Sequence, residues 1–148
     1  MDVLYLFRKY RDDVYRLAAN YTHNPQEAED VCQTVFLKLL EQGELRPGKE
    51  KAWMMQVTVN LCRDLLKSSW WQKTAPLEES MYMAQSENDE TLQALKTLPP
   101  NYRVVLYLRY YEELTSPEIA RLLQIPVSTV TTRVARGREK LKKILEEG

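Results

Sequence analysis

Threonine, arginine and lysine side chains near the C-terminus stand at spacings that suit contact with a DNA duplex. Between Val127 and Ile144, apolar residues recur at the period of an α-helix, which leaves polar residues on the opposite side. That side and its flanks carry Thr129, Thr131, Thr132, Arg136, Lys140 and Lys143. Small hydroxyls let a backbone approach base edges, and arginine makes two-point contacts to guanine or phosphate. The alternative is a solvated face on a surface helix, which is what a run of charge usually means.

The residues before this helix predict another helix and a tight turn. Thr115 and Glu118 form a capping box at the start of the helix 115–123. Pro126 disfavours helical geometry at the residue before it, so the helix should end there, and Ser128 should cap the next one. Two helices joined in this way form a helix-turn-helix, whose second helix enters a major groove. We therefore favour DNA binding over a merely solvated face.

A second set of polar residues follows one stripe of a helix predicted over about residues 49–71. The stripe contains Gln56, Asn60, Arg63, Lys67 and the pair Trp70 and Trp71, and most of the remaining circumference is apolar. Amides and cations can hold phosphates and base edges while a tryptophan offers a stacking platform, which suits single-stranded nucleic acid. The alternative is a solvent stripe whose tryptophans pin the helix end to the core. We favour nucleic-acid contact for Arg63 and Lys67, and for the tryptophans both interpretations stay open.

Composition limits the classes of protein to consider. The 148 residues allow one domain or two small ones, and equal numbers of basic and acidic residues, 21 each, argue against a nonspecific nucleic-acid coat protein. Cys32 and Cys62 lie on apolar helical faces and are expected to be buried thiols, in keeping with a reducing cytoplasm. The sequence lacks a signal peptide and a run of membrane-spanning length. A soluble cytoplasmic protein without membrane insertion is therefore expected.

Periodicity along the chain predicts helices and almost no strand. Helices are expected over residues 3–21, from a cap at Asn24 to Gly43, over 49–71, around 92–98 and over 102–111. Leu40 in the second and Tyr111 in the last are expected to face inward. The fold class is therefore all-α. We predict a helical domain at 1–71, a flexible acidic linker at 72–89 and a helix-turn-helix domain at 90–148.

Several segments, in order along the chain, resemble bacterial extracytoplasmic-function sigma factors. Residues 28–37 (AEDVCQTVFL) are similar to the family signature AEDLVQETFL, and residues 53–66 (WMMQVTVNLCRDLL) are similar to its run WLYRIARNLCRDLLRR. Residues 98–103 (LPPNYR) and 108–111 (LRYY) resemble the segment that precedes the family's helix-turn-helix. The resemblance covers nearly the whole chain apart from the linker.

The resemblance implies a factor that binds core RNA polymerase, directs it to specific promoters and assists promoter opening. Docking on the clamp helices of the polymerase is implied for Glu29, Asp30, Gln33, Thr34 and Lys38. Binding of the downstream promoter element and its melted strand is implied for Gln56, Asn60, Arg63, Asp64, Lys67, Trp70 and Trp71. Binding of the upstream element is implied for Ser128, Thr129, Thr131, Thr132, Arg133 and Arg136. The resemblance also implies docking of the C-terminal domain on the polymerase flap, and an anti-sigma factor is a usual partner in the family.

Some residues depart from the family pattern. Gln56 and Val59 stand where family members often carry arginine. This either weakens the grip on the backbone of melted DNA or shifts it to Arg63, Lys67 and Lys73. Thr131 replaces a usual lysine or arginine, so the upstream sequence that this chain recognises is expected to differ from the common one.

Enzymatic chemistry has little support in the sequence. The single histidine, His23, lies beside a helix cap and fits no zinc template with the cysteines. Glu112 and Glu113 are better explained as a solvated helix end than as a catalytic pair. We predict no enzyme activity, cofactor or metal. The alternatives are a freestanding helix-turn-helix regulator that dimerises through its N-terminal domain and a protein-interaction module that binds polymerase without recognising DNA.

Overall fold

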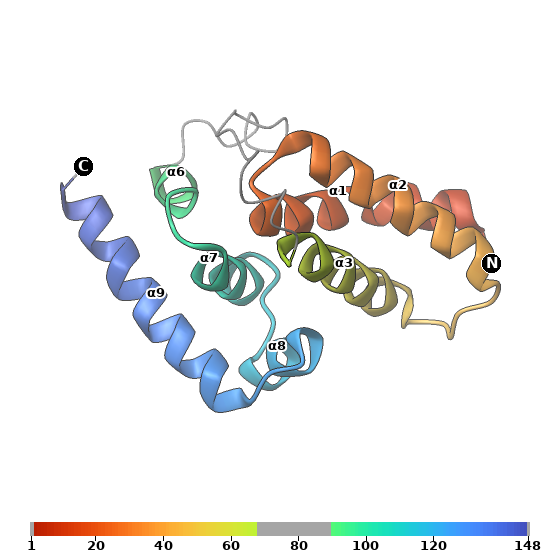
Figure 1. Cartoon of the computed structure of the whole chain (residues 1–148). Coiled ribbons are helices and arrows are strands. Elements are labelled where there is room, and N and C mark those ends of the chain that lie inside the picture. The colour runs from red at the N-terminus through yellow and green to blue at the C-terminus, as the bar shows by residue number, and fades with distance from the viewer. Residues whose placement is uncertain (1, 68–89, 148) are drawn as a thin grey trace. The chain divides into compact units, whose positions relative to one another are not determined.

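The protein is all-α, as predicted. The computed structural model describes residues 2–67 and 90–147, and every regular element within these ranges is helical (Figure 1). The described residues form two compact units, and the division between them falls within the stretch that is not described. The predicted linker at 72–89 lies outside the described residues. No helix in the two described ranges has the length and apolar character that crossing a membrane would require.

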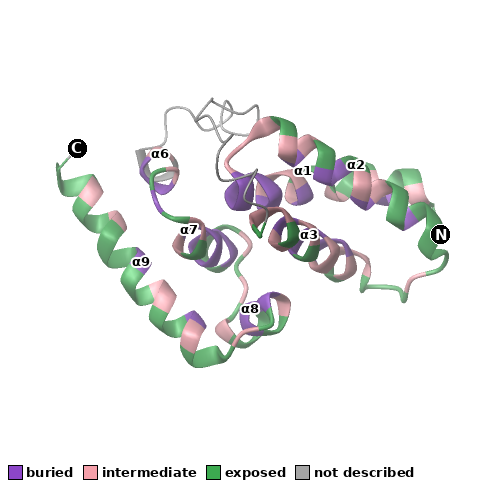
Figure 2. Cartoon of the chain, in the orientation of Figure 1, coloured by how far each residue is buried: buried purple, intermediate pink, exposed green. Residues whose placement is uncertain are grey.

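Three helices form the N-terminal unit. They are α1 (Val3–Thr22), α2 (Pro25–Gln42) and α3 (Glu50–Leu66), and each contacts the other two. The side chain of Asn24 accepts hydrogen bonds from the backbone amides of Gln26 and Glu27, so it caps α2 as predicted. Buried residues line the inner sides of the three helices (Figure 2), and the largest fully buried side chains are Val14, Leu17, Val35, Leu39, Met54 and Val59.

The first two helices run antiparallel, and this limits the core at the far end of α2. Arg11 contacts Glu29 at one level, and the rings of Phe7 and Phe36 lie 4.7 Å apart at another. Leu40 lies one turn beyond Phe36, where α1 has almost reached its first residue and little of it is left to cover the side chain. Leu40 is therefore 53% exposed, and the prediction that it faces inward was wrong.

Helix α9 is the main support of the C-terminal unit. This unit contains α6 (Glu90–Leu95), α7 (Pro100–Leu106), a π-helical turn η1 (Tyr107–Tyr111), α8 (Ser116–Leu123) and α9 (Val127–Glu147). Helices α6, α7 and α8 all contact α9. Leu95, Leu98 and Leu106 are buried together, with Tyr102, Val134, Leu141 and Ile144 of α7 and α9 packed against them. The apolar residues that recur along the sequence of α9 therefore form the face that packs against this cluster.

A glycine permits α9 to approach α7 closely. Gly137 is buried, and a Cβ atom placed on it would lie 3.1 Å from Cδ1 of Leu106 and 3.4 Å from Cβ of Tyr102. Carbon atoms that are not bonded prefer separations of about 3.5–4.0 Å. The two helices can therefore cross this closely because residue 137 has no side chain.

A buried arginine fastens the turn after α6 to α7. Arg103 is only 3% exposed, and its guanidinium donates a 2.7 Å hydrogen bond to the carbonyl oxygen of Leu98 and a 3.5 Å one to that of Lys96. A charged side chain is costly to bury unless its donors are satisfied. The hydrogen bonds from this guanidinium therefore hold the turn at 96–99 in place.

A π-helical turn changes the face that the end of the predicted 102–111 helix presents. The backbone N–H of Glu112 donates to the carbonyl oxygen of Tyr107, five residues back, at 3.2 Å. This wider turn alters the phase of the side chains relative to a regular α-helix. Tyr107 is consequently buried, whereas Tyr111 stacks on it at 5.2 Å and is 48% exposed. The prediction that Tyr111 faces inward was wrong for this reason.

The helix-turn-helix forms as predicted except at the first residue of its second helix. The amide of Thr115 donates to Glu118 at 2.8 Å and the amide of Glu118 donates to the Thr115 hydroxyl at 3.3 Å, which lowers the pKa of the Glu118 carboxyl. Gln124 ends α8 in the left-handed conformation. The carbonyl oxygen of Pro126 accepts the first helical hydrogen bonds, so α9 begins at Val127. Ser128 lies inside the first turn and is not the cap that we predicted.

Candidate nucleic-acid interface

A polar groove lies between the beginning of α7 and the first half of α9. It has a volume of about 270 Å³, and the α9 residues that line it are Ser128, Thr129, Thr132, Arg133 and Arg136. These are five of the six residues predicted to bind the upstream element. The structure thus brings hydroxyl groups and two guanidinium groups together on one concave surface, which is the chemistry that contacts base edges and phosphates.

The sixth predicted residue has another orientation. Thr131 is exposed on α9, and its hydroxyl donates a 3.1 Å hydrogen bond to the carbonyl oxygen of Val127. It does not line the groove. Its methyl group and hydroxyl remain on the exposed side of the helix beside Thr132.

Two residues of α7 complete this groove, and the sequence analysis did not assign them to it. Asn101 and Tyr102 form the wall opposite α9. The ammonium group of Lys140 lies 5.6 Å from the centre of the Tyr102 ring, so the polar surface continues along α9 beyond Arg136. No spacing within the sequence relates residues 101–102 to residues 128–140, because only the packing of α7 on α9 brings them together.

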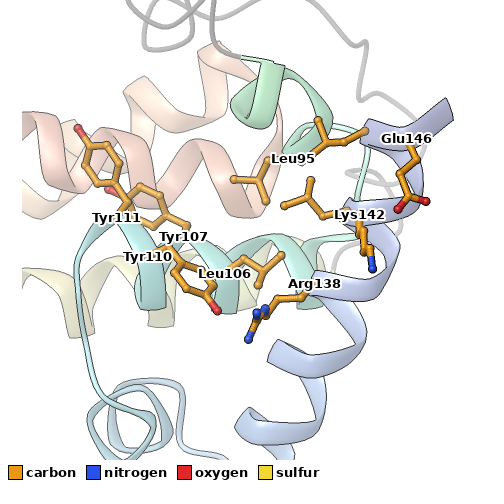
Figure 3. A pocket seen from close by; sticks show the side chains of 10 residues that line it. Leu95, Leu106, Tyr107, Tyr110, Tyr111, Arg138, Lys142 and Glu146 are labelled. Carbon is orange, nitrogen blue, oxygen red and sulfur yellow. The ribbon is translucent and has the colours of Figure 1, made fainter. Parts of the chain in front are cut away.

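An apolar groove lies on the C-terminal side of the same helix crossing. Figure 3 shows side chains of η1 and α9 facing each other across it. Its volume is about 640 Å³, and it is lined by Leu95, Leu106, Tyr107, Tyr110, Tyr111, Arg138, Leu141, Lys142, Leu145 and Glu146. The guanidinium of Arg138 lies 6.0 Å from the centre of the Tyr110 ring. Aromatic and aliphatic surface ringed by charged groups is typical of a protein-binding groove.

The polar stripe of α3 is present on the N-terminal unit. Asn60, Asp64 and Lys67 are exposed, whereas Gln56 and Arg63 are half-buried. The amide of Gln56 donates a 3.2 Å hydrogen bond to the side-chain oxygen of Asn60, so these two amides orient each other. Trp70 and Trp71 lie outside the described residues.

The two cysteines lie on the inner faces of α2 and α3. Both are free thiols and both are buried, as predicted. Burial raises the pKa of Cys32 to about 12 and raises the pKa of Cys62 further. Since the reactive form of cysteine is the thiolate, neither side chain is suited to chemistry at neutral pH.

The predicted polymerase-binding residues lie along the outer side of α2. Asp30, Gln33 and Lys38 are exposed, whereas Glu29 and Thr34 are half-buried. Gln26 donates a 3.2 Å hydrogen bond to the Asp30 carboxylate, and Arg11 pairs with Glu29 at 3.1 Å. These surface contacts leave a polar face that a partner can approach. Leu37 and Leu40 are exposed beside it and add apolar area.

Comparison with known families identifies two matching regions in the order that the sequence analysis expected. Residues 6–72 match the family described as sigma-70 region 2, and residues 88–141 match the one described as sigma-70, region 4. The first match contains α2, α3 and all but the first three residues of α1, and the second contains α8 and the first two thirds of α9. The α2 face, the α3 stripe and the polar groove therefore all lie within matched segments.

Similar proteins extend the comparison to most of the chain. The sigma factor SigE of Mycolicibacterium smegmatis is 29% identical over 95% of this chain, which spans 60% of that relative. SigW of Bacillus subtilis is 29% identical over 93% of this chain, which spans 86% of it. Both are described as ECF RNA polymerase sigma factors.

Two solved structures share the fold. RpoE from Bartonella quintana, solved with the anti-sigma factor NepR, has a TM-score of 0.70 at 16% identity. The alignment covers 98% of this chain and 94% of the RpoE chain. CnrH, solved with the cytosolic domain of CnrY, has a TM-score of 0.68 at 22% identity, with coverages of 98% and 88%.

Proposed function

This chain belongs to the sigma-70 family, in its extracytoplasmic-function branch, and we propose from that premise how its surfaces divide the work of promoter recognition. It is an RNA polymerase sigma factor, so it binds core polymerase and directs it to specific promoters. The synthesis of phosphodiester bonds belongs to the polymerase, and this chain supplies recognition and assists promoter opening. Because its partners are polymerase and promoter DNA, we infer that it acts in the cytoplasm.

The polar groove on α9 binds the upstream promoter element in this proposal. The observation that carries the assignment is the convergence of Ser128, Thr129, Thr132, Arg133 and Arg136 on one groove. Arg136 is exposed and suits a two-point contact with a base, whereas Arg133 is half-buried nearer the apolar side and suits a phosphate. Thr131 contacts the duplex from the exposed side of the same helix.

The stripe on α3 binds the downstream element and its melted strand. Gln56 holds the Asn60 amide, and this leaves the Asn60 nitrogen to face an unpaired base edge. Arg63 and Lys67 then hold the phosphate backbone, and Asp64 lies between them on the exposed side. Trp70 and Trp71 follow in sequence and offer stacking surfaces for the strand.

Two surfaces suit the polymerase itself. The α2 face, defined by Glu29, Asp30, Gln33, Thr34 and Lys38, docks on the clamp helices, and the exposed leucines beside it enlarge the contact. The apolar groove of the C-terminal unit receives the polymerase flap, because its aromatic lining offers apolar area that the DNA groove lacks. An anti-sigma factor is a further partner in this proposal, since RpoE was solved with the anti-sigma factor NepR.

Run-off transcription with the full chain tests the proposed function against its alternatives. Transcript mapping after overproduction identifies the target promoters, and purified chain is then added to core polymerase on those templates. Promoter-specific run-off supports the sigma-factor function. Binding to core without initiation would support an interaction module instead, and footprinting of promoter DNA without polymerase would support a freestanding regulator.

Substituting Arg136 tests the assignment of the upstream site. Arg136→Ala should weaken binding to the mapped upstream element by about 1–3 kcal/mol, because a bidentate base contact is lost. Binding is measured by fluorescence anisotropy on the mapped duplex and on a scrambled one. An equal loss on the scrambled duplex would show that Arg136 contacts phosphate only.

Substituting Asp30 tests the docking face. Asp30 is exposed and its hydrogen bonds are at the surface, so Asp30→Lys should leave α2 folded and abolish binding to core polymerase. The matched control is Glu41→Lys, which makes the same charge change at an exposed position further along α2. Unchanged affinity of the Asp30 variant for core would remove the docking assignment.

A further inference from the structure

We propose that α7 supplies a second wall of the DNA-binding groove, in which Asn101 contacts a backbone phosphate and Tyr102 positions Lys140 on a neighbouring one. The inference rests on the proposed function, because it deepens the same upstream site. It adds three residues to that site, two of them from a helix that precedes the helix-turn-helix in the chain.

The first observation is the shape of the groove. Its α9 wall contains Thr129, Arg133 and Arg136 at intervals of four and three residues, and Lys140 follows four residues later on the same stripe. Asn101 and Tyr102 of α7 form the opposite wall. A strand held by the α9 stripe therefore meets the side chains of α7 as well.

The second observation is how Tyr102 is held. It is half-buried, its Cβ lies against Gly137 at the helix crossing, and its ring packs against the Leu95, Leu98 and Leu106 cluster. A ring fixed in this way keeps the Lys140 ammonium at 5.6 Å from its centre, by a cation–π attraction. The ammonium of the exposed Lys140 is thus drawn toward the Tyr102 side of α9, next to the groove.

The chemistry favours phosphate over a base for both polar groups. In a helix-turn-helix the second helix reads base edges, and side chains from other elements contact the backbone. Asn101 belongs to α7, and its amide nitrogen is a neutral donor that suits a phosphate oxygen. Lys140 is a compact point charge without the planar fork that arginine offers to guanine. Both contacts should therefore be independent of sequence.

Anisotropy titrations of the full chain separate these contacts. The probes are a 24-base-pair duplex carrying the mapped upstream element and a mixed-sequence duplex of equal length, each measured from 50 to 200 mM KCl. The logarithm of the binding constant falls with the logarithm of the salt concentration, and Lys140→Gln should make this slope less steep by about 0.9. Between 50 and 200 mM KCl, the variant should therefore lose about 3.5-fold less affinity than the unmodified chain does. The matched control is Lys142→Gln, on the same helix but in the apolar groove, and its slope should equal that of the unmodified chain.

The Asn101 and Tyr102 variants complete the test. Asn101→Ala should weaken both duplexes equally, by about 3- to 10-fold, without changing the slope. Asn101→Asp should weaken them more, because it places a negative charge against a phosphate. Tyr102→Phe keeps the ring and should behave as the unmodified chain, whereas Tyr102→Leu should lose part of the Lys140 effect. Circular dichroism checks that each variant is folded.

The outcomes distinguish this inference from the proposed function. The inference is overturned if Lys140→Gln changes the slope no more than Lys142→Gln does, or if Asn101→Asp binds as tightly as the unmodified chain. The proposed function is judged separately, by whether the unmodified chain prefers the upstream element over the mixed duplex. If the unmodified chain prefers the upstream element but the α7 variants bind as tightly as it does, the proposed function stands and the second wall is rejected.

Discussion

Replacing Gly137 with valine should loosen the crossing of α7 and α9 and destabilise the C-terminal unit. The first atom of a new side chain would lie 3.1 Å from Cδ1 of Leu106, about 0.4 Å inside ordinary carbon contact. Valine adds two methyl groups beyond that atom, and Leu106 is itself 3% exposed and packed with Leu95 and Leu98. Overpacking of this kind costs about 1–3 kcal/mol, while the better helix propensity of valine returns about 0.4 kcal/mol. The expected net loss is about 0.6–2.6 kcal/mol.

Alanine at the same position is the matched control. It gains about 1 kcal/mol of helix propensity, which offsets the strain of a single methyl group, so Gly137→Ala should be nearly neutral. Gly137→Val combined with Leu106→Ala should be less destabilising than the sum of the two single variants, because the shortened Leu106 makes room for the valine. This coupling isolates the Gly137 contact with Leu106 from any general effect of valine on the helix.

Hydrogen exchange measured by mass spectrometry is the appropriate assay, because the chain has two units that need not unfold together. Amides of α7 and α9 should exchange about 3- to 70-fold faster in Gly137→Val than in the unmodified chain, while those of α1, α2 and α3 serve as the internal reference. The reasoning is refuted if valine and alanine behave alike, or if the exchange of the N-terminal helices accelerates equally.

Three further perturbations test other parts of the structure. Thr115→Ala should destabilise α8 by about 1 kcal/mol through loss of the cap, and the lowered pKa of Glu118 should rise only part of the way toward its ordinary value of 4.5 in an NMR titration, because alanine keeps the backbone N–H that donates to this carboxylate. The stability that Glu118 contributes is present above pH 4.5 and is lost as pH falls through the folded-state pKa. Burial raises the pKa of Cys32 from 9.0 to about 12, so the N-terminal unit should lose stability as pH rises from 9 toward 12, and Cys32→Ala should reduce this loss in urea unfolding. Leu145→Glu places a charge on the exposed part of the apolar groove and should weaken binding to core polymerase, with unchanged affinity for duplex DNA, as measured by anisotropy.

The helices and most of the groove could be predicted because the signals that determine them are local. The capping box of Thr115 and Glu118 involves residues three apart, and the apolar period of α9 continues over 21 residues. Such patterns are visible in any single sequence. Thr129, Thr132 and Arg136 follow from the same period, since a helix that packs one face must present the other, whereas Ser128 and Arg133 were assigned to DNA binding only through the family resemblance.

The errors arise where the arrangement depends on geometry that the pattern does not encode. Tyr111 has the spacing of an inward residue, but the π-helical turn alters the phase just before it. Leu40 has the spacing of a core residue, but α1 has nearly ended where it lies. Ser128 has the chemistry of a cap, yet the first accepting carbonyl belongs to Pro126, two residues earlier. Asn101 and Tyr102 join the groove only through the packing of α7 on α9, which no local signal reports.

The buried Arg103 sets a lower limit on any autonomous C-terminal fragment. A truncated chain that starts at Pro99 would keep the guanidinium but discard the carbonyl groups of Leu98 and Lys96 that receive its protons. It would also lose the two leucines that shield the opposite side of Leu106. A fragment intended for isolated DNA-binding studies therefore has to retain residues 96–98 together with α6, even though no residue of α6 lines the polar groove.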